Sequence, residues 1–397
     1  MKQDHRNIAP RIIIKGFFQG NNLGDNAILE SMLYSIRTKF PRAKIYVLTC
    51  FPKVLEKKYD RFAIKCIYQK NLISVVKILI KNDILIIGGG GLLPFDNPIK
   101  LLRFFYIAIF AKLFLQKVII YSIGLDPIRN SFSRVILKII LGLCADIISV
   151  RDEESRYELK NCNIKKSIFI YSDPAFLLPN TEISLKKQTD KIIPYPYIAV
   201  SIAKPWDITK EPDKEFRYKR FVAECSHMFK KILMEFPDLN LVFIPFFCPG
   251  DKEISQDIIA LIDNISRTKL IDVYGDPQIA KAIIKDASII FGMWYHSVIF
   301  SILSQTPIVA ISYSPKIESL MKKCGLIEFS FRFGVSKDQF YKEETDINFD
   351  AVYVRLKEAY INSVLIKNVL KRAANQLISN AKPIAEIIRE LILWKEK

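Results

Sequence analysis

The chain has 397 residues, half of them hydrophobic, and a formal net charge of +18. This size and apolar content exclude a disordered chain and allow two domains with sizeable cores. Seven scattered cysteines without a C-x-x-C pair and only three histidines argue against a disulfide framework and a structural metal site, and favour a reducing cytosol. The charged N-terminus and the lack of a long apolar run predict neither a secretion signal nor a membrane-spanning helix.

Positive charge is concentrated between residues 53 and 117, which hold twelve lysines and arginines against four acids. Apolar stretches such as LLRFFYIAIFAKLFLQK separate these bases. The combination predicts an interfacial helix on an anionic membrane surface or, alternatively, a core helix in a generally lysine-rich chain. It differs from a solvated nucleic-acid stripe, and no nucleic-acid motif is present, so nucleic acid is not an expected partner.

Six apolar runs in the first half predict buried parallel strands, because each is followed by a glycine or proline turn and a helical pattern. In chain order they are RIIIKG, AKIYVLT, DILIIGGGG, KVIIYSIG, ADIISVRD and SIFIYSDP. They predict a Rossmann-like domain over residues 1–180. A polar, proline-bearing stretch over residues 177–197 then predicts a connection between domains.

The alternation restarts in the second half with YIAVSIA, LNLVFIPFF, LIDVYG, ASIIFGM and TPIVAISYS. Helical patterns around 215–236 and 251–264 lie between them, which predicts a second Rossmann-like domain over 195–345. Residues 346–397 predict helices that return to the first domain. The expected fold is therefore α/β, with two Rossmann-like domains facing across a cleft and a C-terminal helical segment.

The stretch GFFQGNNLGDNAIL follows the first predicted strand and leads into a helix. Such a turn presents backbone N–H groups and a helix N-terminus to an anion or a sugar. Its glycines are spaced by four, unlike a dinucleotide fingerprint or a phosphate loop. The predicted ligand-facing residues are Asn21, Asn22, Gly24 and Asp25.

Further candidates come directly after other predicted strands, where open α/β sheets bind their ligands. GGGGLLPFD lets the backbone approach a ligand through Gly89 and Gly90, the alternative being tight packing of sheet on helix. In SVRDEESR, Arg151 offers a fork of donors suited to a carboxylate or a phosphate.

The richest segment is FGMWYHSVIFSILSQTPIVAISYSPK. It places His296 near the start of a helix, and Ser312 and Lys316 in a loop that leads into the next helix. A histidine there can act as an acid or a base near neutral pH, although a lone histidine is more often structural.

Together, GNNLGDNAIL, IIGGGGLL, SVRDEESR, SDPAFLLP and GMWYHSVIF…TPIVAISYSPKIESLMKKCGL resemble the polysaccharide pyruvyl transferase family, in the same order over about residues 10–330. The resemblance implies a fold similar to the GT-B glycosyltransferases. It also implies transfer of pyruvate from phosphoenolpyruvate, as a cyclic ketal, onto two hydroxyls of a sugar or lipid-linked oligosaccharide. Members serve cell-envelope, capsular or exopolysaccharide synthesis. Phosphoenolpyruvate is the donor substrate, no cofactor is implied, and a cytoplasmic protein peripheral to the inner membrane face is expected.

The resemblance assigns His296 as general acid, and Arg151 and Lys316 as cations for the donor. Asp25 would accept a proton from the acceptor hydroxyl or hold the sugar. The chain departs from the family pattern at Trp294 and Tyr295, where members commonly have arginine and leucine, so one expected cation near the donor is missing.

Two alternatives remain open from the sequence. The first is a GT-B glycosyltransferase that uses a nucleotide sugar, which fits the fold and the charge but lacks an evident E-x-x-x-x-x-x-E ribose-binding pattern. The second, suggested by Trp294, is an inactive relative that acts as a membrane-associated assembly factor.

Overall fold

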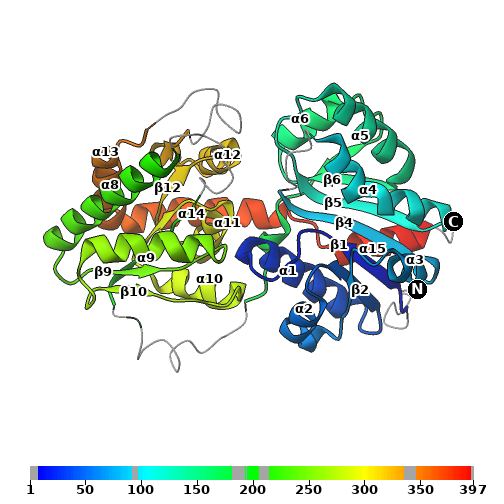
Figure 1. Cartoon of the computed structure of the whole chain (residues 1–397), viewed down its shortest axis with the longest axis horizontal. Coiled ribbons are helices and arrows are strands. Elements are labelled where there is room, and N and C mark those ends of the chain that lie inside the picture. The colour runs from blue at the N-terminus through cyan, green and yellow to red at the C-terminus, as the bar shows by residue number, and fades with distance from the viewer. Residues whose placement is uncertain are drawn as a thin grey trace. The chain divides into compact units, whose positions relative to one another are not determined.

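The chain folds into two compact units, each built on its own sheet (Figure 1). The computed structural model describes residues 8–91, 97–180, 193, 195–204, 214–334 and 346–394. Unit 1 comprises Met1–Gly20, Asp25–Pro179 and Leu377–Lys397, and unit 2 comprises Asn21–Gly24 and Asn180–Gln376. Most of the predicted connection between domains lies outside the described residues.

Unit 1 contains a seven-stranded sheet in the order β3-β2-β1-β4-β5-β6-β7, with every neighbouring pair parallel. The strands are β1 Arg11–Lys15, β2 Lys44–Thr49, β3 Lys65–Tyr68, β4 Ile84–Gly91, β5 Lys117–Gly124, β6 Ile147–Val150 and β7 Ile168–Ile170. Six of them coincide with the predicted runs. Strand β3 was not predicted, because this edge strand has only four residues and only Cys66 among them is buried.

The helices of unit 1 pack on its sheet (Figure 1). They are α1 Leu23–Lys39, α2 Pro52–Lys58, α3 Leu72–Ile80, α4 Pro98–Leu113, α5 Ser131–Cys144, α6 Glu153–Asn161 and α15 Ile384–Trp394. Asparagine or aspartate side chains cap the N-termini of α3, α4, α5 and α6, which satisfies backbone N–H groups there. The strand order reverses between β1 and β4, so the carboxyl ends of these strands form the topological switch point where such sheets bind ligands.

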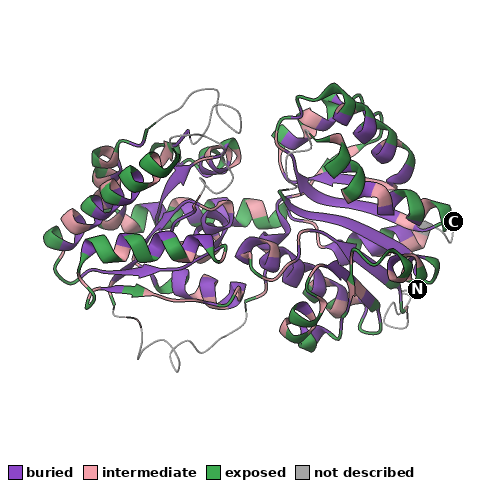
Figure 2. Cartoon of the chain, viewed as in Figure 1, coloured by how far each residue is buried: buried purple, intermediate pink, exposed green. Residues whose placement is uncertain are grey.

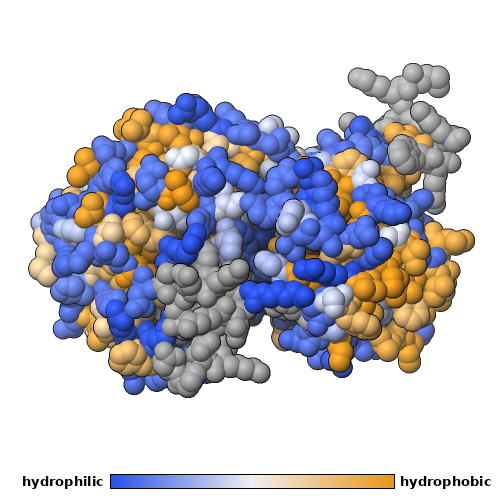
Figure 3. Space-filling view, turned by 90° about the horizontal axis from the view of Figure 1, so that it is seen from above, coloured by the Kyte–Doolittle hydropathy of each residue, from blue (hydrophilic) through white to orange (hydrophobic). Residues whose placement is uncertain are grey.

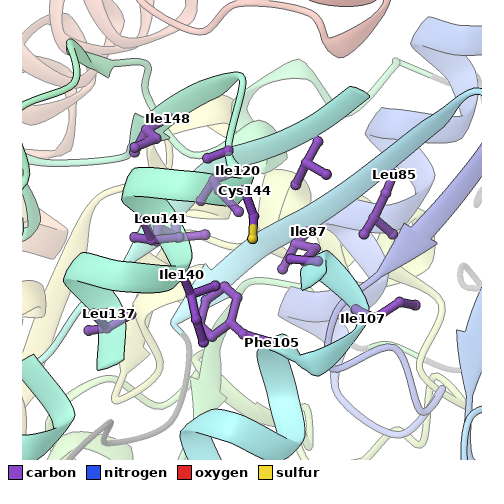
Figure 4. Packing of buried hydrophobic residues seen from close by; sticks show 14 of the residues in the cluster. Leu85, Ile87, Phe105, Ile107, Ile120, Leu137, Ile140, Leu141, Cys144 and Ile148 are labelled. Atoms are coloured by element: carbon purple, nitrogen blue, oxygen red, sulfur yellow. The ribbon is translucent and has the colours of Figure 1, made fainter. Parts of the chain in front are cut away.

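The core of unit 1 lies between the sheet and helices α4 and α5. Figure 4 shows Phe105 from α4 and Leu137 and Ile140 from α5 beside Ile87 and Ile120 of the sheet. All five are buried, and in Figure 2 the strands are buried along nearly their whole length. Burying an aliphatic or aromatic side chain of this size contributes about 1.5–3 kcal/mol to folding, so this layer fixes the strand ends that carry polar residues.

Unit 2 contains a six-stranded parallel sheet in the order β10-β9-β8-β11-β12-β13. The strands are β8 Tyr197–Ser201, β9 Asn240–Phe243, β10 Thr268–Leu270, β11 Ile289–Gly292, β12 Ile308–Ser312 and β13 Ser330–Arg332. The helices are α8 Lys214–Glu235, α9 Gly250–Ile262, α10 Pro277–Asp286, α11 Tyr295–Ser304, α12 Pro315–Lys323 and α13 Phe349–Ile361. The order reverses between β8 and β11, which gives this unit a switch point of its own.

The chain returns to unit 1 at Leu377, in the last turn of helix α14, Ser363–Ser379. The Tyr121 hydroxyl donates to the Lys382 carbonyl at 2.7 Å, and the Ser172 N–H donates to the Asn380 carbonyl at 3.0 Å. The returning segment is therefore bonded to the middle of β5 and to the residues that follow β7. None of the helices that the structure describes is long and apolar enough to cross a bilayer.

Candidate active site

The glycines of β4 bring the strand end against the start of α1. Gly88, Gly89 and Gly90 all have positive φ, which other residues adopt only with strain. A Cβ on Gly89 would lie 2.3 Å from the Ile28 side chain, and one on Gly90 would lie 3.0 Å from Asp25 Oδ1. Gly89 thus permits tight packing, and Gly90 permits the approach of a carboxylate.

Asp25 faces a buried ion pair in unit 1. Arg151 Nη1 lies 3.0 Å from Asp173 Oδ2, with both side chains almost fully shielded from solvent, and Arg151 Nε lies 3.4 Å from Asp152. A Cβ on Gly124 would lie 2.3 Å from Arg151 Nε, so this glycine makes room for the guanidinium. The predicted residues Asp25 and Arg151 are brought together here.

The surroundings of Asp25 suit proton transfer. Burial raises the pKa of the Asp25 carboxyl, the negative charge of Asp173 also raises it and Arg151 lowers it, and together these effects bring the pKa to about 7. The residue itself keeps partial exposure. A carboxyl with a pKa near neutrality can both accept and return a proton.

Asp173 follows a predicted strand in the sequence SDP, at the carboxyl edge of the sheet where such folds bind their ligands. It caps a short 3-10 helix, Pro174–Leu177, by accepting from Ala175 N–H. Its other oxygen, Oδ2, pairs with Arg151. This residue therefore fixes the guanidinium and supplies the negative charge that raises the pKa of Asp25.

In unit 2, the Asn21–Gly24 segment pairs with the loop after β9. Leu23 N–H donates to the Phe246 carbonyl at 2.9 Å, and Cys248 N–H donates to the Asn21 carbonyl at 3.3 Å. The Asn21 side chain donates to the Cys248 carbonyl, and the Asn22 side chain accepts from Gly24 N–H. These two side-chain bonds hold the turn, and the sugar contacts expected of both asparagines remain predictions.

His296 lies directly against Gly24. A Cβ on Gly24 would be 2.0 Å from His296 Nδ1 and 2.5 Å from Cγ and Cε1. His296 is in the first turn of α11, which follows β11 at the switch point, and it is nearly buried. The absence of a side chain at position 24 therefore gives the imidazole its space.

Trp294, at the departure from the family pattern, is part of a hydrogen-bond network. Its indole Nε1–H donates to Asp251 Oδ2 at 2.7 Å, and the same oxygen accepts from Phe246 and Phe247 N–H at 3.0 and 2.8 Å. Burial raises the pKa of the Asp251 carboxyl to about 7, although these hydrogen bonds lower it. Like His296 and Lys316, Asp251 comes after a strand of unit 2, where ligand-facing residues are expected.

Ser312 and Lys316 lie at the same carboxyl edge of the unit 2 sheet, since β12 pairs with β11. The Ser312 hydroxyl is buried and donates to the Ser314 carbonyl at 2.9 Å, so it closes the turn into α12. Lys316 is in the first turn of α12 and is partly exposed. Among the residues that the structure describes, no three His, Cys, Asp or Glu side chains form a metal-binding cluster.

Comparisons with known proteins identify a family and a fold. The sequence profile of the polysaccharide pyruvyl transferase family matches residues 22–315, about three quarters of the chain. No curated protein matches significantly.

Among solved structures, the chain is similar to UDP-GlcNAc 2-epimerase from Neisseria meningitidis bound to UDP-GlcNAc, with a TM-score of 0.63, 12% identity, and coverage of 97% of this chain and 100% of that one. It is also similar to S. aureus MnaA with UDP, with a TM-score of 0.62 and 13% identity, over 98% of this chain and 97% of that one. A glycosyltransferase from Rickettsia africae is similar with a TM-score of 0.57 and 14% identity, over 98% of each chain. These likenesses show a GT-B-like fold with two Rossmann-like domains.

Proposed function

This chain belongs to the polysaccharide pyruvyl transferase family, and on that premise we propose that it transfers pyruvate from phosphoenolpyruvate to two hydroxyls of a sugar, forming a cyclic ketal. The single observation that carries the proposal is the family match over residues 22–315, which includes Gly24, Asp25, Arg151 and His296. The sugar would belong to a capsular, exopolysaccharide or other cell-envelope glycan, free or linked to a lipid.

The donor half of the reaction needs a proton and cations. His296 delivers a proton to the methylene carbon of phosphoenolpyruvate, which becomes a methyl group and leaves the central carbon electron-poor. Lys316 and the N–H groups at the start of α11 hold the donor's carboxylate and phosphate, because cations and helix N-termini favour anions. These roles fit the position of both side chains in the first turns of helices.

The acceptor half needs a base. The first sugar hydroxyl attacks the central carbon and gives its proton to Asp25, whose pKa near 7 allows it to accept that proton at neutral pH. The bond from the central carbon to the phosphate oxygen then breaks, and phosphate leaves with the proton that Asp25 took up. The second hydroxyl attacks the same carbon to close the ring and returns a proton to His296. Arg151, paired with Asp173, sets the charge around Asp25; binding of the donor carboxylate by Arg151 is a further proposal from the family resemblance.

The structure also bears on the missing arginine at position 294. The Trp294 side chain donates a hydrogen bond to the buried Asp251 carboxylate. The residue at position 294 therefore has a structural contact within unit 2. We therefore propose that the chain is an active enzyme and that Lys316 is the cation that binds the donor in unit 2.

We further propose a cytoplasmic location, with peripheral contact to the inner membrane face. All seven cysteines are free, and five of them are buried, which fits a reducing compartment. The alternative, a nucleotide-sugar glycosyltransferase, draws support from neighbours of the same fold whose structures contain UDP or UDP-GlcNAc.

Calorimetric titration with phosphoenolpyruvate and with UDP tests these proposals. We expect phosphoenolpyruvate to bind and UDP to give no heat, and Lys316→Ala to weaken binding by roughly tenfold or more. Lys322→Ala, an exposed lysine in the last turn of the same helix, is the matched control and should bind like the wild type. Binding of UDP alone would identify a glycosyltransferase, and phosphoenolpyruvate binding without phosphate release on any glycan would indicate an inactive relative.

A further inference from the structure

Three neighbouring helices of unit 1 are apolar on the side that faces away from the core. Helices α3, α4 and α5 pack side by side, and each buries one row of apolar residues in the core of unit 1. Each also exposes large apolar side chains, among them Ile73, Ile109, Leu113, Phe132, Ile139 and Leu143. Figure 3 shows hydrophobic surface gathered at the right-hand side of the view. We call these exposed side chains the α3–α5 face.

Helix α4 carries apolar residues both on its buried side and on its exposed side. Leu101, Phe105 and Ala108 of α4 are fully buried, as a core helix requires. Leu102, Ile109 and Leu113 of the same helix are exposed. A surface helix of a globular protein normally carries polar residues on that side, so packing within unit 1 does not account for these side chains.

The charges of the same helices are all of one sign. The sequences of α3, α4 and α5 contain no aspartate or glutamate. They contain six bases, which are Lys77, Lys100, Arg103, Lys112, Arg134 and Lys138. Lys112 pairs with Asp146, and Arg134 donates to the Ile128 carbonyl, so the exposed bases of these helices are Lys77, Lys100, Arg103 and Lys138. Bases beside exposed apolar side chains are the composition of helices that lie in the interface of an anionic bilayer.

We propose that the α3–α5 face docks on the surface of an anionic lipid bilayer, with its leucine, isoleucine and phenylalanine side chains among the acyl chains and its bases at the phosphates. A second copy of the chain is a poorer occupant, because a symmetric contact would bring bases against bases with no acid on either helix surface to compensate. The inference does not depend on the proposed reaction, since it uses no residue of the candidate active site.

The test is cosedimentation of the full-length protein with vesicles of phosphatidylcholine alone, or of three parts phosphatidylcholine to one part phosphatidylglycerol. We expect binding to the anionic vesicles that weakens as salt rises. Replacing Leu113, Leu115 and Leu143 by glutamine removes apolar side chains that are 68%, 88% and 74% exposed, and should lower the partition coefficient by about tenfold for each leucine.

The matched control replaces Met234, Val364 and Leu365 of unit 2 by glutamine, since they are 74%, 73% and 67% exposed. This variant should bind vesicles like the wild type. Equal binding by the leucine variant and the wild type would overturn the proposal. So would no binding of the wild type at any salt concentration, or a stable dimer that the leucine substitutions dissociate without any vesicle binding.

A second variant tests the charges separately. Replacing Lys100, Arg103 and Lys138 by glutamine should lower binding on the order of a hundredfold, because each base near an anionic surface contributes about fivefold. The salt dependence should flatten in the same variant. All three side chains are exposed, so the fold should be retained, and a melting curve like that of the wild type verifies this. Unchanged salt dependence would contradict the proposed lipid contact.

Discussion

Replacing Gly24 by alanine gives the sharpest test of the packing around His296. Gly24 is the second residue of α1, and alanine in a helix is normally more favourable than glycine by up to about 1 kcal/mol. Gly24 does not have the positive φ found at Gly20, so its backbone conformation is open to alanine. Helix propensity alone therefore predicts that Gly24→Ala stabilises the protein.

Sterics reverse that expectation. The added methyl would lie 2.0 Å from His296 Nδ1 and 2.5 Å from two ring carbons, so the imidazole must move. His296 has little free space, because the residue is only 9% exposed and Tyr295 packs against its ring. Overpacking of this kind costs about 1–3 kcal/mol. We expect Gly24→Ala to lower the free energy of unfolding by about that amount.

Urea denaturation of four proteins measures the effect: the wild type, Gly24→Ala, His296→Ala and the double variant. Without the imidazole, the methyl at position 24 should cost nothing or give a small gain, so the coupling between the two changes should be about 1–3 kcal/mol. Gly142→Ala in α5 is the control, since no atom lies within 4 Å of its added carbon. An equal cost of Gly24→Ala in both backgrounds would refute the reasoning.

Three more predictions concern the buried acids. Arg151→Gln strands the Asp173 carboxylate and should cost about 3–5 kcal/mol in urea denaturation; a cost under 1 kcal/mol, as at an exposed pair, would contradict the buried pairing. The pKa of Asp25 is raised on folding, so its contribution to stability is complete below pH ~4 and is lost as pH rises through about 7. The wild type should thus lose up to ~4 kcal/mol relative to Asp25→Asn between those pH values, and parallel pH profiles would exclude this. Trp294→Phe removes a donor to Asp251, whose pKa is also about 7, so its cost should be greater at pH 8 than at pH 5, and a cost independent of pH would count against that bond.

The strands could be read from the sequence because they are buried on both faces. Runs such as RIIIK and KVIIYSIG are almost uninterrupted apolar segments, which is the pattern that parallel sheets impose. The short edge strands β3 and β13 have mixed patterns of four and three residues, and they were not predicted. The strand predicted around LIDVYG lies earlier in the chain, because β10 spans Thr268–Leu270 and shares only Leu270 with that run.

The strand ends also identified most of the polar residues that the structure places at the sheet edges. Their partners could not be read from the sequence. The contact of Gly24 with His296 and the pairing of Trp294 with Asp251 join segments that are distant in the chain, and no local pattern encodes them. The position of Asp173 and Asp251 after strands could be read from the sequence, but their burial could not. The raised pKa of Asp251 and the effect of Asp173 on the pKa of Asp25 follow from that burial and depend on tertiary packing.

The return of the chain to unit 1 has a consequence for biosynthesis. Residues 25–179 leave the ribosome long before Ile384, Ile387 and Ile388, which are fully or almost fully buried. Unit 2 has nearly all of its residues between 180 and 376, so it can complete its sheet first. Unit 1 cannot be completed until the chain has been synthesised through this segment, because Tyr121 and Ser172 bond to the carbonyls of Lys382 and Asn380. A message cut short before codon 380 would therefore yield a finished second unit attached to an unfinished first one, which proteases would find readily.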